Sequence, residues 1–104
     1  MNPWAGEVTL VVDGEPRVLK LTLGALAELE AALKADTLVD LVERFEAGRF
    51  STRDVMALIV AGLRGGGWRV TAADLLAAEI AGGPVAAAQA AGQALARAFA
   101  LPEG

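Results

Sequence analysis

Residues 7–22 read EVTLVVDGEPRVLKLT, and this stretch decides the N-terminal architecture. Two runs rich in leucine and β-branched residues, 7–12 and 17–22, flank the segment Asp13-Gly14-Glu15-Pro16. Asp-Gly between apolar runs is a strong hairpin signal, because both residues tolerate the positive φ that tight turns require. The sequence therefore predicts a β-hairpin, which must pack on later elements because isolated hairpins are only marginally stable. The residues expected to share a face are Val8, Leu10 and Val12 in the first strand and Leu19, Leu21 and Leu23 in the second.

Several helix starts follow the hairpin. Leucines at helical spacing begin near Thr22. Three later starts share one pattern, in which a hydroxyl residue is followed by aspartate three positions on. The hydroxyl accepts a hydrogen bond from a free backbone N–H, and the carboxylate favours the positive end of the helix dipole. These pairs are Thr37 with Asp40, Ser51 with Asp54, and Thr71 with Asp74.

Each predicted helix has one apolar face and ends at glycine, at Gly48, at 65–67 and at 82–83. Pro84 then suits the first turn of a last, alanine-rich helix over about 84–100. We expect its Val85, Leu95 and Phe99 on one side and Gln89, Gln93 and Arg97 on the other. The apolar faces of the earlier helices are Leu23, Leu26, Leu29 and Leu33; Leu38, Leu41, Val42 and Phe45; Val55, Leu58, Ile59 and Leu63; and Leu75, Leu76 and Ile80.

These elements predict an α+β fold that is mainly α. A β-hairpin over residues 6–23 is followed by about five short helices over 24–100. A chain of 104 residues is long enough for one domain, and no linker divides it. We therefore expect a single compact domain over 1–104.

The charge balance disfavours several classes of partner. Thirteen acidic residues against nine basic ones give a net charge of −4, whereas nucleic-acid binders usually carry a basic field. The run Ala81–Ala96 is uncharged, but it is shorter than the roughly 18 apolar residues of a membrane span and contains Pro84. The N-terminal residues lack the pattern of a signal peptide. We expect a cytoplasmic protein that binds neither nucleic acid nor membrane.

Most residue types used in catalysis are missing. The chain has no His, Cys or Tyr, and its one serine, Ser51, is better explained as a helix cap than as a nucleophile. The aspartates Asp40, Asp54 and Asp74 have the same kind of role at helix starts. Without His or Cys, only an oxygen-ligand metal site is open, and no calcium-binding loop pattern is present. The sequence predicts a protein that is not an enzyme and uses no cofactor or metal.

Partner-binding residues are harder to choose, and Trp68 has two interpretations. It is either a lid over the core or an anchor in an interface, where Trp and Arg are enriched. Arginines between 44 and 69 form either a solvated face or an interface that complements acidic groups. The candidate partner-binding residues are Trp68, Phe50, Arg64, Arg69, Val85, Leu95 and Phe99.

The same arginines leave open a small helical DNA-binding regulator, because two helices joined by a glycine turn imitate a helix-turn-helix. Against this reading, the turn over 64–70 is long and rich in glycine. The second helix, over 72–81, also contains acids and no Arg, Asn or Gln that would read bases. DNA binding is therefore the weaker alternative.

Residues 6–30, GEVTLVVDGEPRVLKLTLGALAELE, resemble the opening of the gene transfer agent tail proteins. These are small products of the tail cluster in domesticated prophage particles of alphaproteobacteria. The motifs LVERF (41–45), STRD (51–54) and GLRGG (62–66) and the alanine-rich end extend the resemblance over nearly the whole chain. Its most distinctive part is LTLGALAELE, residues 21–30.

The resemblance implies one of two roles. A tail assembly chaperone would coat the tape-measure protein before the tube grows, whereas a tail tube or connector subunit would form rings in the particle tail. Tube subunits of long-tailed phages are built around a β-sandwich, and this sequence predicts only about two strands. Helical proteins with apolar faces suit a helical partner. We favour the chaperone, with the tape-measure protein or the tail tube protein as partner and self-association as a further option.

Overall fold

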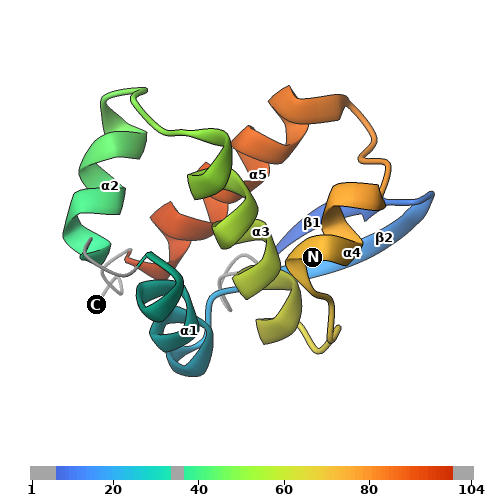
Figure 1. Ribbon diagram of the computed structural model, residues 1–104, viewed down its shortest axis with the longest axis horizontal. Coiled ribbons are helices and arrows are strands. Elements are labelled where there is room, and N and C mark those ends of the chain that lie inside the picture. Colours follow the sequence, from blue (N-terminus) through green and yellow to red (C-terminus); the bar gives the residue numbers. More distant parts are fainter. Residues whose placement is uncertain (1–6, 34–36, 100–104) are drawn as a thin grey trace, which may run out of the picture.

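The N-terminal hairpin forms as predicted, with a turn of two residues. The computed structural model describes residues 7–33 and 37–99. Its first two elements, β1 (Glu7–Val12) and β2 (Glu15–Lys20), are antiparallel (Figure 1). Asp13 and Gly14 alone make the turn, with φ of 51° and 78°. Both angles are positive, as the Asp-Gly signal requires.

The second strand begins and ends two residues earlier than predicted: it runs from Glu15 to Lys20 and includes Pro16. Proline is tolerated there because Pro16 lies opposite Val11, outside the hydrogen-bonded pairs of a two-residue hairpin, and needs no N–H. The predicted buried face is confirmed for both strands up to Leu21. It is wrong for Leu23, which is 85% exposed. Leu23 is already the first residue of a helix, so strand alternation does not apply to it.

Five helices follow in the described residues, which confirms the predicted mainly helical α+β class (Figure 1). The predicted bounds at Gly6 and Ala100 lie outside the described residues. All three predicted hydroxyl–aspartate pairs form reciprocal capping boxes. The helices are α1 (Leu23–Leu33), α2 (Leu38–Glu46), α3 (Thr52–Gly65), α4 (Ala72–Ala77) and α5 (Gly83–Ala98).

Helix α4 is shorter than the predicted range 72–81. It ends at Ala77, and the chain then runs alongside the end of β1. Ile80 pairs with Val12, and the N–H of Ala81 donates to the carbonyl of Val11 at 3.1 Å. These contacts satisfy backbone groups at the outer edge of β1, which a continued helix would leave free. Leu76 was predicted on the apolar face of this helix with Leu75 and Ile80, but it is 72% exposed.

Helix α3 is the central element of the core. Figure 1 shows α1 and α2 on one side of it and the hairpin with α4 on the other. Leu58, Ile59 and Leu63 of α3 are fully buried. Helix α5 packs on α3 and β1 through alanines, whose small side chains let the backbones approach closely. The alanines buried in α5 are Ala87, Ala90, Ala91 and Ala94.

The end of α3 packs directly on the outer edge of β2. A Cβ atom added to Gly65 would lie 1.9 Å from the carbonyl oxygen of Lys20. One added to Gly66 would lie 2.2 Å from the carbonyl oxygen of Val18. These glycines, predicted only as a connection between helices, are therefore packing positions that admit no side chain.

Candidate protein-binding surface

The turn between α2 and α3 places an aromatic pair on the surface. Helix α2 ends in a Schellman motif, in which Gly48 has a φ of 71° and the N–H of Arg49 donates to the carbonyl of Arg44 at 2.8 Å. The chain then reverses, and Phe50 stacks on Phe45 with ring centroids 4.5 Å apart and planes within 9° of parallel. Phe50 stays 36% exposed. The turn therefore presents one face of this pair to solvent.

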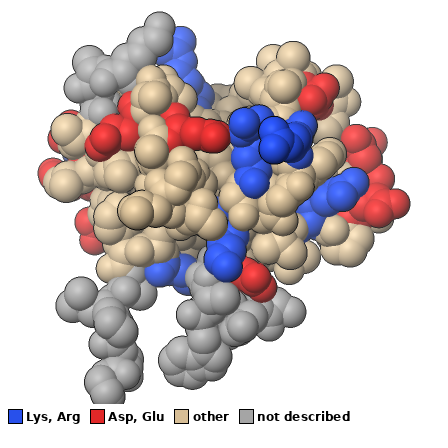
Figure 2. Space-filling view, turned by 90° about the horizontal axis from the view of Figure 1, so that it is seen from below, with Lys and Arg blue, Asp and Glu red and all other residues tan. Residues whose placement is uncertain are grey.

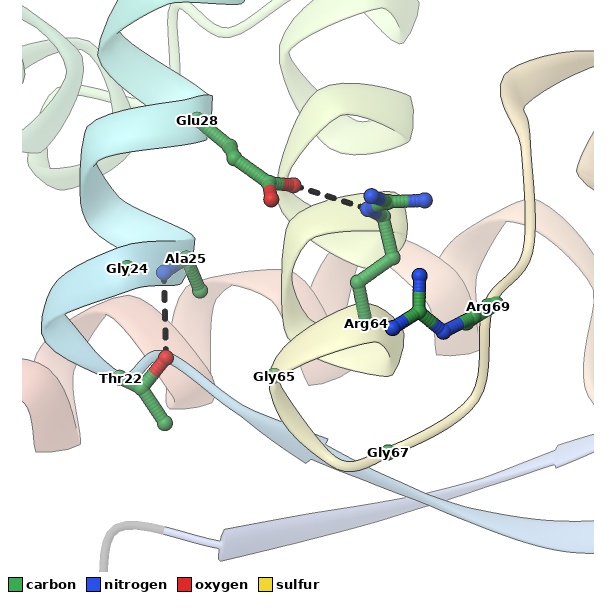
Figure 3. A pocket seen from close by; sticks show the side chains of 8 residues that line it. All are labelled: Thr22, Gly24, Ala25, Glu28, Arg64, Gly65, Gly67 and Arg69. Atoms are coloured by element: carbon green, nitrogen blue, oxygen red, sulfur yellow. Dashed lines mark hydrogen bonds and ion pairs between the residues drawn. The ribbon is translucent and has the colours of Figure 1, made fainter.

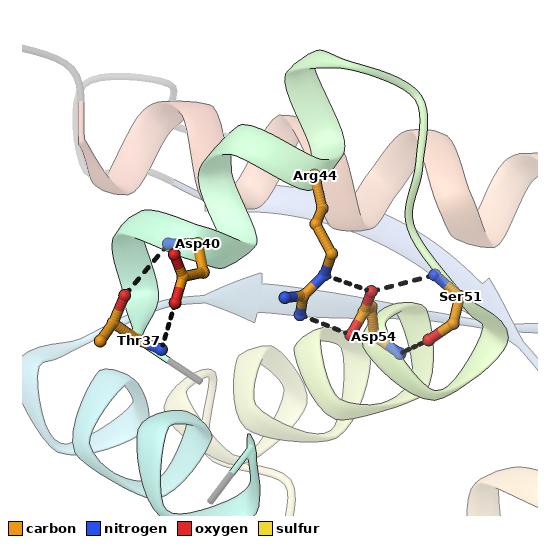
Figure 4. Close-up of polar contacts among 5 residues, drawn as sticks. All are labelled: Thr37, Asp40, Arg44, Ser51 and Asp54. Atoms are coloured by element: carbon orange, nitrogen blue, oxygen red, sulfur yellow. Dashed lines mark hydrogen bonds and ion pairs between the residues drawn. The ribbon is translucent and has the colours of Figure 1, made fainter. Parts of the chain in front are cut away.

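An ion pair between α2 and α3 holds this turn in place (Figure 4). Arg44 donates from Nε and Nη2 to the two carboxylate oxygens of Asp54, at 3.0 and 2.9 Å. Asp54 also accepts from the N–H of Ser51 at 2.9 Å, because Ser51 is the N-cap of α3 and Asp54 is its partner in the capping box. Two parallel bonds from one guanidinium fix orientation as well as distance. The pair therefore sets how α2 lies on α3.

Asp54 is only 5% exposed, and its environment favours the charged form of its carboxyl group. Burial raises the pKa of Asp54, but the hydrogen bonds from Arg44 and Ser51 and the charge of Arg44 lower it by more, so the pKa of this carboxyl lies below its ordinary value. A depressed folded-state pKa stabilises the fold above the unfolded value and loses that effect as the pH falls through the folded value. The link between α2 and α3 is therefore sensitive to acid, below about pH 4.

An apolar trough runs along the outer face of α5 and is divided by Phe45. One part, about 430 Å³, lies between α2 and the C-terminal half of α5. The other, about 800 Å³, lies between the aromatic pair and the N-terminal half of α5. Both parts include Phe45 and Gly92, where a Cβ would lie 3.6 Å from the Phe45 ring. The further lining residues are Val42, Glu46, Leu95, Ala96 and Phe99 in the first part and Phe50, Pro84, Val85, Ala88, Gln89 and Gln93 in the second.

Four predicted partner-binding residues line this trough. Phe50 and Phe99 are partly exposed, whereas Leu95 is 3% exposed and belongs mainly to the core. Val85 was expected on the side of Leu95 and Phe99, but it shares the exposed face with Gln89. Ten residues separate 85 from 95, a rotation of about 280° at 100° per residue, so the two positions do not coincide. Val85 therefore lies at the exposed rim of the trough, whereas Leu95 contributes only to its buried floor.

The other three predicted residues lie elsewhere. Trp68 is half-buried and packs on the core, and the guanidinium carbon of Arg17 lies 4.1 Å from its ring centroid. This arrangement supports the interpretation of Trp68 as a lid over the core. Arg64 and Arg69 line a separate pocket of about 350 Å³, in which Arg64 Nε donates to Glu28 Oε1 at 2.8 Å (Figure 3). The predicted residues therefore do not form one site.

Sequence reasoning missed Phe45, Val42 and Gly92 as surface residues. Phe45 and Val42 were assigned to the apolar face of α2, which is where they are. The pattern of one helix does not indicate which other helix covers its apolar face, or how completely. Gly92 had the only available signal, a glycine inside a helix, which often marks a close approach.

The described residues contain little that suggests chemistry. Within residues 7–33 and 37–99, no three acidic side chains lie close enough to hold a metal ion together. In the same ranges, every helix is too short or too polar to cross a bilayer. The acidic side chains with the most contacts, such as Asp54 and Asp74, cap helices.

A hairpin and five helices, in the residues that the structure describes, present an apolar trough on the surface, the kind of feature through which small proteins bind other proteins. The comparison with protein families gives the particular family. The chain belongs to the family described as phage tail tube protein, GTA-gp10, whose model matches residues 5–101. This match confirms the resemblance to gene transfer agent tail proteins and covers nearly the whole chain. No curated protein and no solved structure matches the chain.

Proposed function

We propose that this protein is a tail assembly chaperone that binds the tape-measure protein through the trough between α2 and α5. The observation that carries the proposal is an aromatic, apolar surface beside a long exposed helix face. An amphipathic helix that lies in an apolar groove is a common form of peptide recognition. The mechanism is passive, because the trough would cover apolar parts of the partner until tube subunits replace the chaperone.

The size of the trough supports a helical occupant. From Val85 to Phe99, α5 rises about 21 Å at 1.5 Å per residue. This is about four turns of a partner helix that lies alongside it. Phe45 borders both parts of the trough and stacks on Phe50, and this rigid aromatic surface gives contact area at low entropic cost. Gly92 also lines both parts of the trough, and its lack of a side chain keeps α5 low beside the Phe45 ring.

A structural tail tube subunit is the second candidate, because the family is described by that name. A subunit that joins neighbours through its sheet needs free strand edges. Here the end of α3 lies on the outer edge of β2. On β1, residues 79–81 bond the end of the strand, and Arg97 donates to the carbonyl of Glu7. This coverage of the hairpin favours the chaperone.

The proposal also implies where in the cell the protein acts. A chaperone acts in the cytoplasm, where phage-like particles assemble, and meets the tape-measure protein before the tail tube protein. A tube subunit would instead remain in the particle tail. Self-association through the trough would compete with binding of the tape measure, since both would cover the same apolar surface.

Co-expression with the tape-measure protein of the same gene cluster tests the proposal. We expect a soluble complex with several copies of this chain per tape measure, measured by affinity pull-down and light scattering. The double variant Phe50→Ala/Phe99→Ala should remove most of the binding, because both side chains are exposed in the trough. Leu23→Ala is the matched control, because Leu23 is a large exposed apolar residue outside the trough.

Two results would contradict the chaperone. One is the formation of rings or tubes by this protein alone, without a complex, which makes it a structural subunit. The other is a complex that the double variant forms as well as the unaltered chain, which places the contact outside the trough.

A further inference from the structure

A second groove lies on the opposite side of α3, between α1 and the chain that enters α4. Its volume is about 630 Å³. Its floor is a stripe of α3 at positions i, i+3, i+4, i+7, i+8 and i+11, so these side chains share one helix face. In order, the stripe is Arg53, Met56, Ala57, Val60, Ala61 and Arg64. The walls are Glu28, Leu29 and Ala32 on one side and Val70, Thr71 and Ala72 on the other.

The charge of this groove contrasts with that of the whole chain. Arginines close both ends of the stripe, about 16 Å apart along the helix at 1.5 Å per residue. Arg64 pairs with Glu28, whereas Arg53 has no ion-pair partner among the residues that the structure describes. Exposed Arg69 adds a further positive charge beside Arg64 (Figure 3). Figure 2 shows basic side chains gathered on one face, with acidic side chains and uncharged residues beside them, on a protein whose net charge is −4.

We propose that this groove binds an amphipathic helix of a partner protein, with an acidic residue at each end of an apolar stripe about three turns long. Ala57 and Ala61 allow a helix backbone to come close, and Met56 adapts its shape to the apolar side chains it meets. The arginines select acidic ends and fix the register. The groove is separate from the trough, so this inference goes beyond the proposed function and does not depend on it.

Other occupants fit the groove less well. Its middle is apolar and offers nothing to a phosphate backbone, and an acidic protein repels nucleic acid. A second copy of this chain would have to supply the acidic helix. Its most acidic described helix, α2, has Asp40, Glu43 and Glu46 within less than two turns, and Asp40 is occupied in a capping box. A partner protein is therefore the better match.

A pair of labelled peptides tests the proposal by fluorescence polarisation. Both are stapled helices of 15 residues with leucines at helical spacing, and one has glutamate at each end of the stripe while the other has lysine. We expect the glutamate peptide to bind at least tenfold more tightly than the lysine peptide at low salt. Amide shifts in an NMR titration should map to the groove, around Met56 and Val60.

Variants separate this site from its surroundings. Arg53→Glu should weaken binding of the glutamate peptide about 5- to 10-fold and strengthen binding of the lysine peptide, because it reverses the charge at one end of the groove. Arg49→Glu is the control, because it makes the same charge change at an exposed arginine outside the groove. Phe50→Ala, in the trough, should leave the peptide affinity unchanged.

Any one of four outcomes would overturn the inference. The first is equal binding of the two peptides, and the second is no binding of either peptide at millimolar concentration. The third is an equal effect of Arg49→Glu and Arg53→Glu, which would indicate a non-specific charge effect. Tighter binding of a 20-base-pair DNA duplex than of the glutamate peptide would also overturn it, because the groove would then recognise phosphates.

Discussion

Replacement of Gly65 by alanine should destabilise the protein strongly, although helix propensity alone predicts the opposite. Gly65 is the last residue of α3, and alanine is better than glycine in a helix by up to about 1 kcal/mol. However, the added Cβ would lie 1.9 Å from the carbonyl oxygen of Lys20 and 3.2 Å from the Cβ of Ala25. Ordinary carbon–oxygen contact needs more than 3 Å, so α3 and β2 must separate by about 1 Å.

That separation opens the core where Leu19 packs on α3. Overpacking against backbone costs about 1–3 kcal/mol, and lost contacts in the core add to it. We expect a net loss of about 3 kcal/mol in the free energy of unfolding. For a chain of about 100 residues this corresponds to a fall in Tm of roughly 12–24 °C.

Urea denaturation followed by circular dichroism at 222 nm measures this loss. Gly24→Ala is the matched control, because it is also a helical glycine of this chain and its added Cβ would meet only Thr22 Oγ1, at 3.9 Å. It should raise stability by about 0.5 kcal/mol, from helix propensity. A Gly65→Ala variant as stable as the unaltered protein would refute the reasoning, because the edge of β2 would then not be closed by α3.

Three further predictions concern the surface and the link between α2 and α3. Acidification below about pH 4 should reduce stability more steeply in the unaltered protein than in the Asp54→Asn variant. The measurement is the urea midpoint of unfolding as a function of pH. Parallel curves for the two proteins would exclude Asp54 as a source of the acid sensitivity. Trp68→Ala should lower the free energy of unfolding by about 2–3 kcal/mol, while the folded fraction still binds the tape-measure protein. Weakened binding without a loss of stability would instead make Trp68 an interface anchor. Gly92→Ala should preserve or raise Tm, because alanine is the better helix former. The added methyl group lies in the trough, so the affinity for the tape-measure protein should fall severalfold. An unchanged affinity would contradict the proposed contact.

The parts of the fold that could be predicted are those with local signals. Asp13-Gly14 specifies the hairpin turn through backbone angles that few residues adopt. The capping boxes specify three helix starts through contacts between residues three positions apart. Each of these signals is complete within a few residues, so a single sequence is enough to read it.

The failures arise from contacts between distant segments. Helix α4 ends early because residues 79–81 bond to β1, almost 70 positions away in the chain. The glycines at the end of α3 pack on β2, which no pattern within 65–67 indicates. Tertiary contacts override local preference at both places.

The candidate surfaces were predictable only in part, for the same reason. Phe50 and Phe99 could be chosen because large aromatic residues are few in this chain. The groove on α3 was missed, although arginines of that region were suspected of meeting acidic groups. Its apolar residues, such as Met56 and Val60, have the spacing of an ordinary core face. Only the arrangement of α1 and α4 shows that this face is left uncovered.

The coverage of β1 has a consequence for synthesis on the ribosome. The outer edge of β1 is completed by residues 79–81 and by Arg97, which are made long after the strand itself. Translation at about 5–20 residues per second needs roughly 4–17 s to proceed from residue 12 to residue 97. During that interval, neighbouring nascent chains on one messenger RNA would each expose an unfinished strand. Slow translation, or removal of residues 79–97, should therefore favour misassembly between chains before any partner is met.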